Sequence, residues 1–235
     1  NTALSHRLQF APHRFFCSGI QTYYDILNFI NEVKLGIHPF LDKDCQYDFF
    51  SYSIGSTLTE VLLTSNYNGY FDNSRAFLFC GGAALDTTDP VCKTIMDKEA
   101  HSELFRWLAT LFESVTDMSR RVKEIFFQEL PEVLNFKSFL FYEKMQSYRE
   151  LTLKNNSSKI RGLCLKKDQV FPMDAAKKTL NGFYNDIDIK MDIIDFPYEY
   201  KHEEPFPATE KNRDEVDKAF NEVLTAATDF FNRSA

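Results

Sequence analysis

The segment Ser51-Tyr52-Ser53-Ile54-Gly55 joins two stretches of the chain that have different sequence patterns. Residues 47–52 are rich in aromatic side chains, which favours a short β-strand. From Ser56 onward apolar residues recur at helical spacing, and Thr57 and Glu60 have the spacing of a capping box. The quoted segment is therefore predicted to be a tight turn that leads from a strand into a helix.

Strand and helix patterns alternate on both sides of this turn. Further strands are expected at 74–80, at 160–165 and from Ile187, where strict period-two alternation indicates a half-exposed sheet edge. Helices are expected at about 21–34, from Pro172 to Gly182, and after Asn212 and Glu215, whereas residues 1–19 are expected to be irregular. The alternation predicts an α/β fold with a mainly parallel sheet, helices on both faces, and sites at the carboxyl ends of the strands.

Two helical regions of this fold have distinctive apolar residues. The last helix is expected to bury one stripe, formed by Val216, Phe220, Val223, Leu224, Ala227 and Phe231. Residues 86–157 are predicted to be a helical insertion between two strands, within a single domain that spans residues 1–235. The aromatic side chains of 126–142 are expected either to line an apolar pocket or to pack the insertion against the body of the domain.

The composition excludes several classes of protein. The 235 residues include 27 Lys and Arg against 34 Asp and Glu, and this net charge of −7 argues against general nucleic-acid binding. No apolar run approaches the roughly 20 residues that span a bilayer. The five cysteines are scattered without a CxxC pair, which argues against a disulfide framework or zinc cluster and suits a reducing, cytoplasmic compartment.

Three residues that carry chemistry each follow a different predicted strand. Ser53 lies in the turn described above, Asp168 precedes a helix that Pro172 opens, and His202 lies in the loop before the last helix. Taken singly, Ser53 is also compatible with a small helix-start residue, Asp168 with an Asx turn, and His202 with a solvated side chain. Together, a hydroxyl, an imidazole and a carboxylate in three such loops suit nucleophilic catalysis with a general base.

In this order and placement, the sequence resembles the α/β-hydrolase superfamily over residues 21–85 and 158–235. Its turn reads S-x-S-x-G, one position away from the G-x-S-x-G nucleophile elbow. The resemblance implies a serine hydrolase of esterase, lipase, thioesterase or peptidase type. Ser53 would be the nucleophile, Asp168 the acid, His202 the base, and the Ile54 N–H one oxyanion donor. It also implies a lid at 86–157, a small-molecule acyl substrate and no cofactor.

The sequence departs from the family pattern at two points. Ser51 replaces the first glycine of the elbow, and only 52 residues precede Ser53, too few for the usual strands and for the loop that supplies the second oxyanion donor. We therefore expect a missing amino-terminal segment, or a second copy of the chain, to complete the sheet. A hydrolase-like protein that binds or regulates without turnover is the alternative, and a lyase or peroxidase on the same fold is a third interpretation.

Other reactive side chains rank below these three. Asp86 and Asp89 follow an apolar strand and are the alternatives to Asp168 as the acid. Cys80 ends the same strand and is expected to be buried and inert. His101 is expected to be a surface residue of the helical insertion, and the short basic run of Arg120, Arg121 and Lys123 is expected to form a solvated helix face.

Overall fold

A four-stranded parallel sheet forms the centre of the molecule. The structure is a computed structural model that describes residues 3–88, 98–113, 120–209 and 211–232. Within these ranges the strands are β1 (Phe49–Tyr52), β2 (Ala76–Phe79), β3 (Ile160–Leu165) and β4 (Lys190–Ile194), and they pair in that order. The predicted α/β class, the parallel sheet and the position of the last strand at an edge are confirmed.

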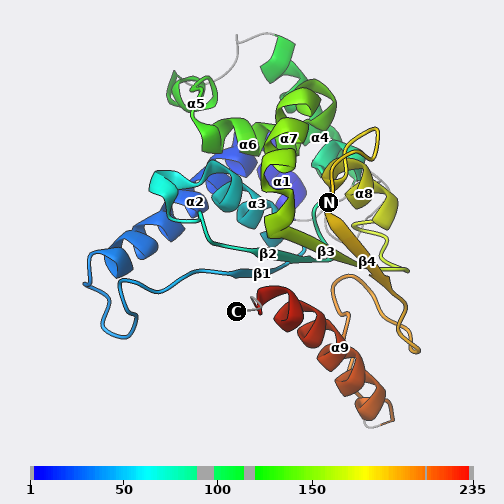
Figure 1. Cartoon of the computed structure of the whole chain (residues 1–235). Helices are drawn as coiled ribbons and strands as arrows, with labels where there is room; N and C mark the ends of the chain where they lie inside the picture. The colour runs from blue at the N-terminus through cyan, green and yellow to red at the C-terminus, as the bar shows by residue number, and fades with distance from the viewer. Residues whose placement is uncertain (1–2, 89–97, 114–119, 210, 233–235) are drawn as a thin grey trace.

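Helices cover both faces of this sheet, as the sequence predicts. Figure 1 shows α9 (Arg213–Phe231) alone on one side, with the other helices gathered on the opposite side. Alternation along β2 explains the two layers: Ala76 and Leu78 belong to the core beneath α2 (His13–Lys34) and α3 (Gly55–Ser65), whereas Phe77 and Phe79 belong to the core beneath α9.

The remaining helices precede the sheet or lie between its strands. They are α1 (Ala3–Phe10), α4 (Lys98–Glu113), α5 (Arg120–Phe126), α6 (Pro131–Leu140), α7 (Tyr142–Asn156) and α8 (Met173–Leu180), with short 3-10 turns at Tyr67–Gly69, Leu85–Thr87 and Ser157–Lys159. The expectation that residues 1–19 are irregular is wrong, because α1 and the first turns of α2 occupy most of that segment. Pro12 stands immediately before α2, where its missing N–H costs no helical hydrogen bond.

Two details of the predicted helices also differ. The Thr57–Glu60 pair forms no capping box, since α3 has no side-chain cap hydrogen bond. On α9, Val216, Val223 and Ala227 are buried as expected, but Phe220 and Leu224 are 45% and 39% exposed. The face of α9 that meets the sheet is therefore narrower than the apolar stripe in the sequence.

The aromatic side chains of the helical insertion pack into the core. Phe126, Phe136 and Phe139 are all buried, and Phe16 of α2 meets Phe126 and Phe136 edge-on at 5.1 and 5.7 Å between ring centroids. Of the two interpretations of residues 126–142, packing against the body accounts for these three rings.

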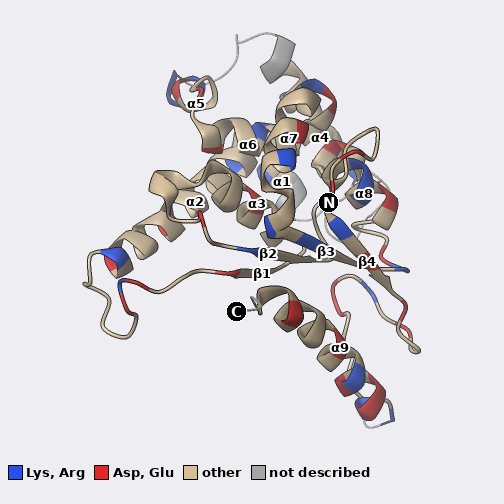
Figure 2. Cartoon of the chain, viewed as in Figure 1, with Lys and Arg blue, Asp and Glu red and all other residues tan. Residues whose placement is uncertain are grey.

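The charged residues are dispersed over the surface helices. Figure 2 shows Lys or Arg together with Asp or Glu on several of the same elements, α9 among them. Among the described residues, no helix is both long enough and apolar enough to cross a bilayer.

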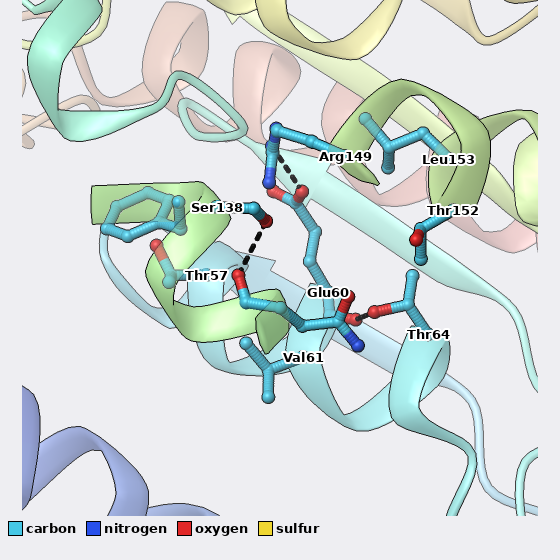
Figure 3. Close-up of a pocket in the computed structure, with 10 residues that line it drawn as sticks. Thr57, Glu60, Val61, Thr64, Ser138, Arg149, Thr152 and Leu153 are labelled. Atoms are coloured by element: carbon cyan, nitrogen blue, oxygen red, sulfur yellow. Dashed lines mark hydrogen bonds and ion pairs between the residues drawn. The ribbon is translucent and has the colours of Figure 1, made fainter. Parts of the chain in front are cut away.

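One ion pair of the core ties α3 to α7. Figure 3 shows Arg149 of α7 reaching the carboxylate of Glu60, and the Nη2–Oε2 distance is 2.7 Å with both side chains 4% exposed. Arg149 Nη2 also lies 3.4 Å from the carbonyl of Gly82. Burial raises the pKa of Glu60, and the charge of Arg149 opposes that rise. The carboxylate that the capping box would have used is thus engaged in a contact across 89 positions of sequence.

Removing one member of this pair should destabilise the fold strongly. Because Glu60→Leu leaves a buried guanidinium without its partner, we expect it to lower the free energy of unfolding by about 3–5 kcal/mol. The double variant Glu60→Leu/Arg149→Leu should recover a large part of that loss, as measured by urea denaturation. As a control, Glu124→Leu removes the exposed pair with Arg120 and should cost no more than about 1 kcal/mol. A double variant less stable than Glu60→Leu would contradict the assignment.

Candidate active site

Ser53 occupies a strained turn between β1 and α3. Its φ angle is +56°, in the left-handed region that a residue other than glycine rarely adopts. The Ser53 N–H donates a hydrogen bond to the Phe79 carbonyl at 3.1 Å, which continues the β1–β2 ladder up to the turn itself. This strand–turn–helix geometry is that of a nucleophile elbow.

The residues around the turn explain how Ser51 replaces the first glycine of the motif. Ser51 is buried, and its Oγ lies 3.4 Å from both Ser56 Oγ and the Phe77 carbonyl, so the small hydroxyl is accommodated. The close backbone approach occurs instead at Gly81. A Cβ there would lie 2.0 Å from Ser56 Oγ and 2.9 Å from the Ser53 carbonyl oxygen, so only glycine fits.

The structure brings together the three residues that the sequence singled out. Ser53 Oγ lies 2.7 Å from His202 Nε2, and His202 Nδ1 lies 2.8 Å from Asp168 Oδ2. Asp168 follows β3 and His202 lies in the loop after β4, so the contacts span 149 and 34 positions of sequence. The imidazole and carboxylate side chains are only 3% and 0% exposed, whereas Ser53 is partly accessible.

The hydrogen bonds around Asp168 determine the tautomer of His202. The other carboxylate oxygen, Oδ1, accepts hydrogen bonds from the N–H groups of Val170 and Phe171 at 2.8 and 3.0 Å. Carboxylate oxygens accept hydrogen bonds, so Nδ1 of His202 is the donor to Oδ2 and carries the hydrogen. Nε2 is then left as an acceptor for the Ser53 hydroxyl, which is the arrangement a general base requires.

Two aromatic residues that sequence reasoning missed hold the imidazole in place. The Tyr52 ring stacks on His202 at 5.4 Å between centroids, and the Phe171 ring lies at 5.5 Å. The Tyr52 hydroxyl also donates a hydrogen bond to the backbone carbonyl of His202. Burial, reinforced by nearby acidic groups that include Asp168, raises the pKa of Tyr52 to about 12, so the hydroxyl remains a donor at neutral pH. The only signal in the sequence for the role of Tyr52 was its place beside Ser53.

Ile54, which follows Ser53, is 53% exposed. Ile54 is the N-cap residue of α3, and the N–H groups at the start of a helix have no intrahelical acceptor. The positive end of the helix dipole lies at the same point, which favours a developing negative charge. Elsewhere, the described part of the chain gathers no group of three or more His, Cys, Asp or Glu side chains that could hold a metal ion.

The lower-ranked candidates lie in other surroundings. Asp86 accepts a hydrogen bond from the Glu143 N–H at the start of α7, and Asp89 lies outside the described residues. His101 is partly buried and stacks on Phe105 at 4.3 Å between ring centroids. Arg120 is exposed and pairs with Glu124 at 2.7 Å, as expected for a solvated helix face.

Cys80 is close to Asp168 but is fully buried. Burial raises the pKa of its thiol, and the negative charge of Asp168 raises it further, so the thiol stays protonated at neutral pH.

Cys80 should therefore be inert in the native protein. With iodoacetamide at pH 8 we expect the partly exposed Cys45 to be modified, while Cys80 reacts only after denaturation, as read by peptide mass spectrometry. Modification of Cys80 as fast as that of Cys45 in folded protein would contradict this assignment.

Comparisons with known proteins place the chain in a family. No curated protein matches it. Among solved structures it is similar to one described as a serine hydrolase, CCSP0084 from the polyaromatic hydrocarbon-degrading bacterium Cycloclasticus zankles, with 18% sequence identity and a TM-score of 0.36. The match covers 80% of this chain and 66% of the neighbour's length. The family model described as "Family of unknown function (DUF6051)" matches residues 1–232, and the chain therefore belongs to that family.

Proposed function

We propose that this protein is a serine hydrolase of the α/β-hydrolase type, which cleaves an ester, thioester or amide through an acyl-Ser53 intermediate. The observation that carries the proposal is the continuous hydrogen-bonded chain from Ser53 Oγ through His202 to Asp168. Under this proposal the described helices of the insertion, α4 to α7, form the cap of the domain, and the reaction uses the side chains of the protein without a cofactor.

The first half of the reaction forms the acyl-enzyme. Ser53 Oγ attacks the carbonyl carbon of the substrate while its proton passes to His202 Nε2. The carbonyl oxygen becomes an oxyanion, for which the Ile54 N–H at the start of α3 is one donor. As the intermediate collapses, the bond to the leaving group breaks, and the leaving group takes the proton back from His202.

The second half of the reaction releases the acid. Water gives a proton to His202 and attacks the acyl carbon, the bond to Ser53 Oγ breaks, and Oγ recovers the proton. Asp168 keeps the imidazole in one tautomer and stabilises its cationic form in both halves. The two N–H groups that bind Asp168 Oδ1 hold the carboxylate in the position that this role requires.

The burial of His202 favours catalysis over the alternative of a hydrolase-like binding protein. A base that had lost its function would be free to turn toward solvent, yet His202 is 4% exposed and enclosed by two aromatic rings. Hydrogen bonds at both nitrogens fix the orientation of the His202 ring, and this restriction costs conformational entropy. That ordering suits proton transfer at a fixed position.

A fluorophosphonate probe tests the proposal directly. We expect the purified protein to be labelled on Ser53, and Ser53→Ala to abolish the labelling. His202→Ala should slow it by about 10²–10⁴-fold, the range typical of general-base catalysis. Ser147→Ala, an exposed serine on α7, is the matched control and should label like the parent. Folded protein that takes up no label, or that labels equally after Ser53→Ala, would leave the binding or regulatory function in its place.

The Tyr52 hydroxyl is expected to position the base. Tyr52→Phe keeps the ring on His202 but removes a hydrogen bond to its backbone, and one such bond contributes about 0.5–1.5 kcal/mol. We therefore expect kcat to fall about 2–13-fold with KM unchanged. Tyr198→Phe removes a comparable bond to the Pro205 carbonyl in the same loop and should leave kcat unchanged. Equal effects of the two variants, or a change in KM alone, would refute a positioning role.

A further inference from the structure

A cavity of about 230 Å³ opens beside the turn that carries Ser53. It lies between the first half of α2 and the start of α3, with α6 contributing one ring. Its lining residues come from these three helices and from the turn: Phe15, Ser18, Gly19, Thr22, Ile54, Gly55, Thr57, Leu58 and Phe136. None of them carries a charge, so the cavity suits an uncharged ligand.

The hydroxyl groups on the α2 side of the cavity are already engaged. Ser18 Oγ donates to the Phe15 carbonyl at 3.1 Å, and Thr22 Oγ1 donates to the Ser18 carbonyl at 2.8 Å. Because these bonds lie within the helix, the two side chains leave little hydrogen-bonding capacity for a ligand. With the rings of Phe15 and Phe136 and the side chain of Leu58, the wall is largely apolar.

Gly19 allows this cavity to have an aromatic floor. A Cβ at Gly19 would lie 2.0 Å from the tip of the Phe136 ring, so the ring rests directly on the backbone of α2. Phe136 is held there by Phe16 at 5.7 Å and Phe139 at 6.4 Å, and it is only 5% exposed. The floor is therefore rigid, which gives the cavity a definite depth.

The cavity adjoins the turn that carries Ser53. Ile54 and Gly55, which line it, follow Ser53 directly, and Ile54 supplies the proposed oxyanion donor. Under the proposed function, an acyl chain bonded to Ser53 Oγ would extend into this apolar cavity. The volume is smaller than the 300–1,000 Å³ of a whole drug-sized ligand site, so it suits one part of a substrate.

We propose that this cavity binds the acyl group of the substrate, and that the substrate class is an ester, thioester or amide of an uncharged, apolar acid of medium length. This inference rests on the proposed function. Because the cavity is smaller than a whole drug-sized ligand site, it suits an acyl chain of medium length, on the order of six to eight carbons.

A larger cavity of about 530 Å³ between α2 and α5 is the competing location. Its lining includes His13, Arg14 and Arg121, and none of its lining residues belongs to the turn around Ser53. Basic groups favour an anionic ligand, and an acyl chain would lose affinity against them. The smaller cavity is therefore the one assigned to the acyl group.

A chain-length series of p-nitrophenyl esters, from acetyl to dodecanoyl, tests the assignment. We expect kcat/KM to rise about fourfold with each added methylene up to hexanoyl or octanoyl and then to fall. Thr22→Trp fills the cavity from the exposed face of α2 and should lower kcat/KM for the octanoyl ester at least tenfold more than for the acetyl ester. Gln21→Trp is the matched control on the same helix, next to the larger cavity, and should leave both esters within twofold.

The outcomes separate this inference from the function on which it rests. If a methyl-substituted fluorophosphonate labels Ser53 and the acetyl ester is cleaved, the proposed function holds whatever the series shows. A flat chain-length profile, or loss of octanoyl activity in Gln21→Trp rather than in Thr22→Trp, would then overturn the acyl cavity alone. Phe136→Leu lowers the floor and should move the optimum to longer chains, and an unmoved optimum in folded Phe136→Leu would also overturn it.

Discussion

A left-handed backbone conformation at a residue other than glycine costs about 1–3 kcal/mol, so the turn at Ser53 is stable only because contacts on both sides of it hold the backbone in this conformation. On one side the β1–β2 ladder runs to the Ser53 N–H. On the other side, α3 is fixed by the buried pair of Glu60 and Arg149, and the backbone at Gly81 passes so close to the Ser53 carbonyl that a side chain there would collide with it. The hydroxyl of Ser53 is thereby placed by the fold before any substrate arrives, which is the preorganisation that catalysis needs.

The parallel sheet explains how three distant residues meet. The strands run in one direction, so the loops after β1, β3 and β4 all leave the sheet at the carboxyl ends of the strands. The chain also turns sharply after the carboxyl end of β2, where Cys80 has a φ angle of +50°, close to that of Ser53. Cys80 is fully buried, whereas Ser53 is partly accessible. Burial, more than backbone shape, therefore separates the proposed nucleophile from an inert thiol at the end of the neighbouring strand.

Sequence periodicity predicted the elements whose form depends on local pattern, and it failed where a side chain from outside the element formed a competing contact. Strand β3 has the predicted bounds, 160–165. The strand expected from Ile187 begins only at Lys190, because the Asn181 side chain donates to the carbonyls of Ile187 and Ile189 at 2.8 and 2.7 Å. The capping box failed for the same kind of reason, since the partner of Glu60 lies in another helix. Neither competing contact leaves a periodic trace in the sequence.

The three polar side chains of the candidate site were easier to predict than the residues that support them. A hydroxyl, a carboxylate and an imidazole after three strands make a recognisable order, whereas the Tyr52 contact with His202 spans 150 positions and follows no motif. Gly19 is an intermediate case. A glycine inside a helix costs about 1 kcal/mol relative to alanine, so its presence within α2 indicates that something approaches the backbone there. The structure identifies that neighbour as the Phe136 ring, and the packing that accommodates it also shapes the cavity beside Ser53. A residue with low helix propensity thus marks the position of a tertiary contact. The sequence indicates that Gly19 is such a position, but it does not identify Phe136 as the partner.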